Sequence, residues 1–312
     1  MDSKDISCID KAMEFGVKML SYTKECLMTC DVVYIDYDSR LQDIAIYKQV
    51  MSDILDMNKE VILSHDLRIK LEIGPVPVSD TASYWDSLIN IPVPVIMVYT
   101  QGEHTDQLAC ELGIRKCFSE AGYKLSQVGS TNAGQFFGFH PVPDLLYTQL
   151  EPSEKILSLN YYINNLVSTE KPELLIMGVP NAIMKYDNRI LQGMGVLPFI
   201  ISSAVLGDIS VLSINYSDNT KKNYDEINAL FKYRFGSPVN FFCMSNVHTS
   251  PDDRSGRRRL AYLDIDIDAV TKKINEQVEF DDYHLFNALT EESMMEACRA
   301  IQIALVDNVR SF

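Results

Sequence analysis

The sequence lacks an apolar run long enough to cross a membrane, since a membrane-spanning helix needs about 20 consecutive apolar residues. Its longest candidate stretch, residues 196–206, is too short and contains Pro198. The first ten residues are polar and charged, unlike a secretory signal. We therefore expect a soluble, cytoplasmic protein that does not associate with membranes.

Positive charge is also scarce. The chain has 28 basic and 43 acidic residues, which gives a formal net charge of -15. Nucleic acids and anionic lipids bind positive surfaces, so this balance argues against a nucleic acid as partner. One basic cluster stands out, and we interpret it as a solvated loop rather than a phosphate or carboxylate site. It contains Arg254, Arg257, Arg258 and Arg259.

Several chemical motifs are missing. The seven cysteines are odd in number and include no CxxC pair, which favours reduced thiols over a zinc site or a disulfide framework. The sequence has no G-x-S-x-G nucleophile elbow, no H-E-x-x-H helix, no calcium-binding loop and no GxGxxG dinucleotide fingerprint. It therefore identifies no cofactor, and binding of a metal or a nucleotide stays open.

What the sequence does have is an alternation of short apolar runs and longer amphipathic stretches. Strands are expected at residues 31–36, 60–64, 95–100, 123–128, 173–179, 209–214 and 239–245. Helices are expected at residues 10–29, 39–57, 106–121, 152–169, 197–206, 222–234, 268–277 and 290–308. This order predicts a doubly wound, mostly parallel sheet in a three-layer α/β/α fold, Rossmann-like or degenerate P-loop-like.

A change in composition divides the chain. Residues 1–72 read as a small Rossmann-like βαβ unit, and residues 95–312 as a larger P-loop-like domain with C-terminal helices. Residues 73–94 are rich in proline, which interior strand and helix positions exclude, so we expect a linker there.

Parallel sheets of this kind bind ligands beyond the carboxyl ends of their strands. Four loops are expected at that edge, and they span residues 101–106, 129–145, 180–195 and 245–259. The functional candidates are sought in these four loops.

The turn after the strand at 95–100 has the layout of a phosphate-binding loop without its chemistry. Counting from Gly102, Gln107 stands at the second glycine position, and Leu108 and Ala109 replace the lysine and the hydroxyl. Hydrolysis of ATP in the usual P-loop manner is therefore not expected. The following helix N-terminus still offers free amides to an anion. Thr105 and Asp106 either cap this helix or contact a ligand.

Two histidines are expected on the same edge. His104 lies in the turn after the 95–100 strand, and His140 lies in the segment FGFHPVP. With Asp106 they are the catalytic candidates, as an acid/base pair, and the two histidines are the candidate metal ligands. The alternative is that each histidine forms only local hydrogen bonds.

Further ligand-binding candidates follow from the same placement. Phe139 belongs to an aromatic loop that is either a buried lid or an apolar pocket. Asn181 follows a central strand at the place where a nucleotide-binding protein would carry an acidic magnesium ligand, and Asn246 follows the strand at 239–245. The complete set of ligand-binding candidates is Gly102, Glu103, Thr105, Phe139, Asn181 and Asn246.

Four segments together resemble a known family. These are GEHTDQLACELGIRKCFSEAGYKLSQVGS, FGFHPVP, KPELLIMGVPNAIM and LFKYRFG, and the resemblance covers roughly residues 30–250. They are similar to the clostridial-type peptide maturation system proteins, which occur beside radical-SAM maturases of ribosomally made peptides. The family turn reads close to G-E-N-T-D-K, so His104 and Gln107 depart from it.

The resemblance implies an accessory protein in the maturation of a ribosomally synthesised, post-translationally modified peptide. Its partner would be the precursor peptide, the radical-SAM maturase or a small ligand, bound at the carboxyl edge of the sheet. Two alternatives remain: a metal- or phospho-ligand-dependent enzyme that uses His104, Asp106 and His140, and a nucleotide-binding regulator without hydrolysis. A homodimer is a possible assembly.

Overall fold

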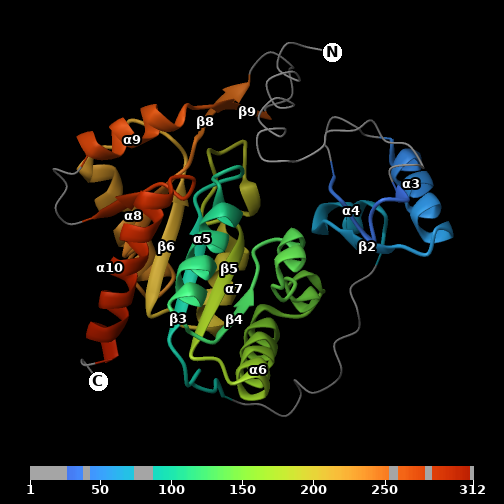
Figure 1. Cartoon of the computed structure of the whole chain (residues 1–312), viewed down its shortest axis with the longest axis horizontal. Coiled ribbons are helices and arrows are strands. Elements are labelled where there is room, and N and C mark those ends of the chain that lie inside the picture. The colour runs from blue at the N-terminus through green and yellow to red at the C-terminus, as the bar shows by residue number, and fades with distance from the viewer. Residues whose placement is uncertain (1–26, 38–42, 74–86, 253–258, 278–282, 310–312) are drawn as a thin grey trace. The chain divides into compact units, whose positions relative to one another are not determined.

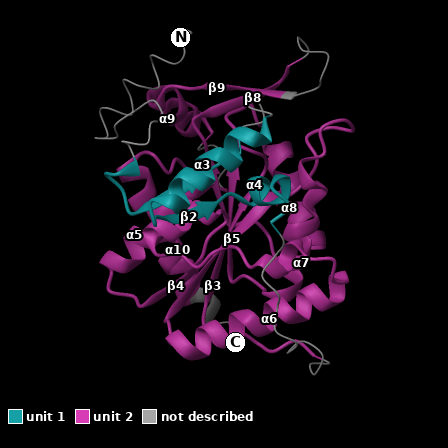
Figure 2. Ribbon diagram, turned by 90° about the vertical axis from the view of Figure 1, so that its right-hand side faces the viewer, with its two compact units in different colours: residues 1–74 teal, residues 75–312 magenta. Residues whose placement is uncertain are grey.

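A computed structural model describes residues 27–37, 43–73, 87–252, 259–277 and 283–309. The chain divides into two compact units, residues 1–74 and 75–312, which Figure 2 shows in different colours. The second unit thus begins inside the proline-rich segment at 73–94. Most of the helix expected at residues 10–29 lies outside the described residues.

The first unit contains a small parallel βαβ arrangement. Strand β1 (Val32–Ile35) pairs in parallel with β2 (Glu60–Leu63), and helix α3 (Ile44–Asp56) connects them. A further helix, α4 (His65–Lys70), begins where the Ser64 hydroxyl accepts a hydrogen bond from the Leu67 N–H at 3.4 Å. The sequence did not predict α4, because its six residues are too few to show helical periodicity.

The second unit is built on a sheet of six parallel strands in the order β10-β7-β6-β3-β5-β4. The strands are β3 (Val95–Thr100), β4 (Leu125–Val128), β5 (Leu174–Ala182), β6 (Ile209–Ile214), β7 (Phe241–Met244) and β10 (His284–Phe286). Strands β3 and β6 have the bounds that their apolar runs predict, because every residue in both is buried. The first strand of this unit along the chain, β3, therefore lies inside the sheet.

Helices cover both faces of this sheet (Figure 1). Helices α5 (Gln107–Glu120) and α10 (Glu291–Val309) pack on one face. The opposite face carries α6 (Pro152–Glu170), α7 (Val196–Ala204), α8 (Lys221–Arg234) and α9 (Ile267–Glu276). The three-layer, doubly wound α/β fold expected from the sequence is confirmed. Among the described residues, no helix combines the length and the apolar character that crossing a membrane requires.

Beyond the sheet, the structure differs from the sequence prediction after β7. Strands β8 (Val247–Asp252) and β9 (Arg259–Asp264) form an antiparallel pair, in which Thr249 lies opposite Tyr262. The sequence predicts a loop over residues 245–259, because β8 carries mostly polar residues and Pro251. A short antiparallel pair outside the main sheet can keep such residues, since it need not be buried on both faces. Most of the arginine cluster lies outside the described residues.

Glu111 on α5 is a fully buried carboxyl group inside the second unit. Its Oε2 accepts a hydrogen bond from the Ser130 N–H at 3.2 Å, and its Oε1 has no partner. Gly178 on β5 provides the space for the Glu111 carboxyl group, because a Cβ at this position would lie 2.5 Å from Oε1. Burial raises the pKa of Glu111 to about 7, and the bonds from Ser130 offset only part of this.

This pKa predicts a pH-dependent stability. Above the ordinary carboxyl pKa of 4.5 the unfolded chain releases the Glu111 proton, whereas the folded protein keeps it until about pH 7. The free energy of unfolding therefore falls by roughly 3 kcal/mol between these values and is level above them. Urea denaturation at pH 5 and pH 8 should show that Glu111→Gln removes this fall, while Glu120→Gln, at an exposed position of α5, keeps it. A Glu111→Gln protein with the wild-type difference would contradict the assignment.

Candidate functional site

The connections that leave β3 and β6 diverge. The chain passes from β3 into α5 on one face of the sheet, and from the neighbouring β6 into α8 on the other face. Such a divergence opens a crevice at the carboxyl ends of the two strands, which is where open α/β sheets bind ligands. The functional site is therefore expected around the ends of β3 and β6.

The turn after β3 is held close to the sheet. The Gln101 N–H donates to the Ser213 carbonyl of β6 at 2.8 Å. The Thr100 hydroxyl lies 2.6 Å from the Thr105 hydroxyl and also bonds the Gly102 carbonyl. Thr105 is buried, and its hydroxyl closes the turn.

Asp106 and Asn246, both predicted site residues, are brought together. The Asp106 carboxylate accepts the Asn246 N–H at 2.7 Å and forms no side-chain cap on α5. Burial raises the pKa of Asp106, and nearby Asp264 adds to this, whereas the Asn246 bond and His104 lower it. The loops after β3 and β7 therefore meet at one edge, as the sequence predicts.

The Asn246 side chain is engaged within the protein. Its amide group donates to the Ile265 carbonyl at 3.0 Å, and its carbonyl oxygen accepts from the Asn287 amide at 2.7 Å. Asn246 thus connects the end of β7 to the segments before α9 and α10. This arrangement favours the loop-capping role for Asn246 over direct ligand contact.

Glu103 and His104 both contact Tyr262 on β9. The Tyr262 hydroxyl donates to the Glu103 carboxylate at 2.8 Å, and the rings of His104 and Tyr262 have centroids 4.2 Å apart. Burial raises the pKa of Tyr262, and the bond to ionised Glu103 raises it further. The sequence gives no signal for Tyr262, because its strand β9 follows a segment that the sequence predicts to be a loop.

His140 does not share a site with His104, contrary to the sequence prediction. Its backbone pairs with the outer side of β4, where the His140 N–H donates to the Gln127 carbonyl at 2.8 Å. Strand β4 is the edge strand and β5 separates it from β3, so His140 lies three strand spacings from β3, about 14 Å. Its imidazole instead bonds the Glu170 carboxylate at 2.8 Å.

A metal site has no support from this geometry. In the part of the chain that the structure describes, no three His, Cys, Asp or Glu side chains are placed to hold a metal ion together. The geometry also argues against a joint acid/base pair of His104 and His140, because His140 lies beyond the edge strand β4 and bonds Glu170. What remains at the β3 edge is His104 with Glu103, Asp106 and Tyr262.

Phe139 anchors the loop after β4. It is buried, its ring lies 5.4 Å from the Arg115 guanidinium, and it packs so closely on Gly134 that a Cβ there would approach it to 2.5 Å. Phe136 and Phe137 in the same loop are about half exposed, at 48% and 49%. Of the two interpretations that the sequence allows, Phe139 thus fits the buried lid.

Backbone strain is concentrated at the carboxyl edge. Of the eight described non-glycine residues with positive φ, five lie at the end of β5 or in the loops after β3 and β5: His104, Asp106, Asn181, Gln192 and Met194. Residues 192–195 form a left-handed turn, with φ of 45°, 74°, 56° and 72°. Each non-glycine residue in such a conformation costs about 1–2 kcal/mol. Conformations of this cost concentrate at functional sites.

This left-handed turn brings polar side chains against Gly102. A Cβ at Gly102 would lie 3.3 Å from the Gln192 amide oxygen and 3.4 Å from the Asn215 amide nitrogen. Asn181 lies beside the same turn, since its amide nitrogen is 2.9 Å from a Cβ position at Gly193. Gly102 and Asn181, both predicted from the sequence, therefore lie next to Gln192 and Asn215, which were not.

Four carboxamides thus surround the ends of β3 and β6: Gln101, Asn181, Gln192 and Asn215. The Asn215 oxygen accepts from the Thr249 hydroxyl at 3.0 Å, and the Gln101 oxygen from the Asn215 N–H at 3.4 Å. Their side-chain amide N–H groups have no hydrogen-bond partner among the described residues. A signal was present in the sequence, since Gln101 and Asn215 each directly follow an apolar strand.

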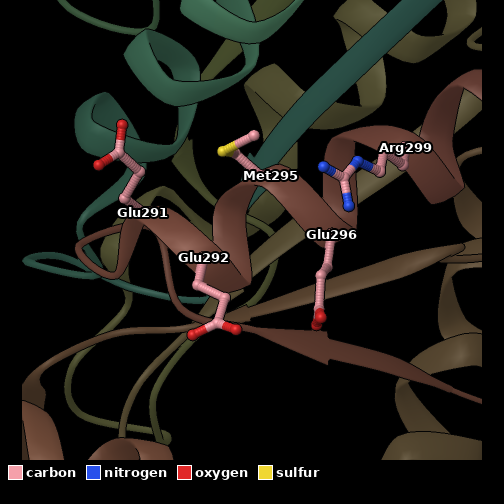
Figure 3. A pocket seen from close by; sticks show the side chains of 5 residues that line it. All are labelled: Glu291, Glu292, Met295, Glu296 and Arg299. Atoms are coloured by element: carbon pink, nitrogen blue, oxygen red, sulfur yellow. The ribbon is translucent and has the colours of Figure 1, made fainter.

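Surface hollows of the described residues also lie away from this edge. A groove of about 810 Å³ runs along residues 88–95 and 202–208 at the amino edge of the sheet, but its polar groups are occupied: Asp208 accepts the Val95 N–H at 2.8 Å, and Asn160 bonds Ala204. A second hollow is lined by side chains of α10 alone, as Figure 3 shows. A third, of about 260 Å³, has a mainly apolar lining that includes Leu174, Leu305 and Val306. None of these three hollows gathers polar side chains from several strand ends as the carboxyl edge does.

No family model matches the chain, and no curated protein matches it. Among solved structures, a DUF1611 family protein from Anabaena variabilis is similar, with 9% identity over 90% of this chain and 84% of that chain and a TM-score of 0.51. The chimerical protein CapA2B2 matches at 16% identity over 49% and 75% of the two chains, with a TM-score of 0.32. A pseudomurein peptide ligase type C from Methanothermus fervidus matches at 10% identity over 80% and 44%, with a TM-score of 0.25.

These comparisons support the fold and nothing finer. At 9% identity, the DUF1611 protein shares the α/β architecture of this chain. The other two structures share too little of it to add to that conclusion. The resemblance to clostridial-type peptide maturation proteins therefore rests on the sequence motifs alone.

The bond between Asp106 and Asn246 predicts a stability difference between two substitutions. Asp106→Ala leaves the Asn246 N–H without its acceptor and should lower the free energy of unfolding by roughly 1–3 kcal/mol. Asp106→Asn keeps an acceptor oxygen and tolerates the left-handed backbone, so it should cost clearly less. Urea denaturation of both variants measures the difference. Equal stability of the two would show that this bond does not hold the loops together.

Proposed function

We propose that this protein is an accessory protein of ribosomal-peptide maturation that binds its precursor peptide where β3 and β6 end. The observation that carries the proposal is the group of four carboxamides near the ends of β3, β5 and β6, whose side-chain N–H groups have no partner among the described residues. A carboxamide offers both donors and an acceptor, and every peptide unit except proline needs both. An extended peptide main chain is therefore the ligand that this group of side chains suits best.

The maturation context comes from the sequence resemblance. Three of its motifs are the turn that contains Gly102 and Asp106, the segment around His140, and the strand that contains Asn181. Two of these three motifs contain or adjoin the carboxamides. Residues that carry the sequence resemblance therefore lie at the proposed peptide site. A radical-SAM maturase would be the second partner, acting on the peptide held here.

A nucleotide fits the same place less well. The turn that would surround phosphates carries two carboxylates, Glu103 and Asp106, which repel an anion. The Gln107 amide donates to the Val98 and Val179 carbonyls at 2.8 and 2.9 Å, so it fills the space between β3 and β5. Residues 101–107 contain no lysine or arginine to bind a phosphate, and this favours a neutral polar ligand.

An enzyme that uses His104, Asp106 and His140 is the other alternative. The distance between the two histidines removes their joint action, and Asp106 is engaged by Asn246. His104 remains as a single exposed imidazole beside Tyr262. This is less than the pair of positioned groups that general acid/base catalysis uses.

The proposal is tested with a phage-displayed library of linear dodecapeptides, followed by fluorescence anisotropy of the enriched peptides. The double variant Asn181→Asp/Gln192→Glu keeps side-chain size and the left-handed backbone but replaces amide donors with acceptors. It should weaken binding at least tenfold, which corresponds to about 1.4 kcal/mol. The control Asn275→Asp/Gln302→Glu adds the same charge on α9 and α10 and should bind normally. Failure to enrich any peptide, or equal weakening by the control, would refute peptide binding here.

A further inference from the structure

The segment from the end of β5 into α7 exposes an unusual number of large apolar side chains. Five of them are between 39% and 53% exposed, within fourteen residues. We call these residues the apolar patch: Tyr186, Leu191, Met194, Val196 and Phe199. Singly exposed apolar residues are normal, but a group of this kind on a surface indicates a binding face.

The backbone holds much of the apolar patch together. The Met194 N–H donates to the Leu191 carbonyl at 2.8 Å, which closes the left-handed turn between them. Val196 and Phe199 are one turn apart on α7 and so share a face. The Arg234 guanidinium donates to the Met194 carbonyl at 2.7 Å, which fixes the turn to α8. The strained turn thus presents these side chains in a defined arrangement.

Two cations and one carboxylate lie beside the apolar patch, which gives it a locally positive balance in a chain whose net charge is -15. Lys185 and Arg189 are exposed in the same loop, and neither forms an ion pair with a carboxylate of the described residues. The intervening Asp187 uses its carboxylate on the Arg189 and Ile190 N–H groups, at 2.7 and 2.8 Å. The Lys185 ammonium donates to the neutral Asn188 side chain at 2.5 Å, so its charge is not neutralised. A partner that meets this surface therefore finds apolar contacts next to two exposed cations.

We propose that the apolar patch, with Lys185 and Arg189, docks a segment of the bound peptide that carries both apolar and acidic side chains. The inference rests on the proposed function and names the chemistry of its peptide. The apolar patch is continuous with the carboxamides, since Gln192 lies between Leu191 and Met194. Lys185 and Arg189 select the carboxylates, because the rest of this acidic chain repels them.

The test uses three labelled synthetic peptides with the same leucine and phenylalanine positions and with Glu, Lys or Ser at the remaining positions. At physiological ionic strength, where a Debye length of about 8 Å limits the effect of distant charges, the wild-type protein should bind the Glu peptide more tightly than the Lys peptide. The charge-reversal variant Lys185→Glu/Arg189→Glu should invert this order. The control Lys48→Glu/Arg299→Glu makes the same change of charge at exposed positions elsewhere and should keep the wild-type order.

The outcomes separate the two proposals. Peptide binding without an acidic preference, or a preference that survives Lys185→Glu/Arg189→Glu, overturns this inference and leaves peptide binding at the carboxamides intact. An acidic preference that is insensitive to Asn181→Asp/Gln192→Glu supports the apolar patch and refutes the carboxamide site. A dimer in sedimentation that dissociates on Leu191→Ser would show that a second copy covers the apolar patch, and would overturn the inference.

Discussion

The parallel pairing of β3 with β5 on one side and β6 on the other determines where every loop of the candidate site begins. Thr100 at the end of β3 lies opposite both Ala182 and Ser213, so three strands end at nearly the same level. All residues of β3 and β6 are buried between helices on both faces, which prevents these strands from shifting their register. The turn after β3, the loop after β5 and the residues after β6 are adjacent for this reason.

From that edge, the strained turn at residues 192–195 connects two properties of the surface. Its left-handed backbone turns Gln192 toward Gly102 and leaves Met194 exposed. Gly193 and Gly195 adopt positive φ without a Cβ penalty, whereas Gln192 and Met194 do not, and Arg234 helps to hold them. A conformation with this cost is expected where its geometry serves binding. The carboxamides and the apolar patch therefore form parts of one surface.

Much of this arrangement follows from the sequence. Apolar runs give β3 and β6 their bounds, and the alternation of strands and helices gives the parallel sheet and the edge at which Gly102, Asp106, Asn181 and Asn246 lie. The order of the strands does not follow, because apolar runs do not say which strand is at the edge. His140 was therefore expected near His104, although it pairs with the edge strand β4. Tyr262 and Gln192 could not be predicted, because they lie in segments without a regular hydrophobic pattern. Without that pattern, the sequence indicates neither the pairing of β8 with β9 nor the positive φ of Gln192.

Amide hydrogen exchange with and without an enriched peptide tests the central claim most directly, because it reports where on the sheet the ligand binds. If the ends of β3 and β6 form the site, the peptide slows exchange in residues 101–107, 181–196 and 215–217. Protection confined to residues 88–95 and 202–208, along the groove at the amino edge, would contradict the account.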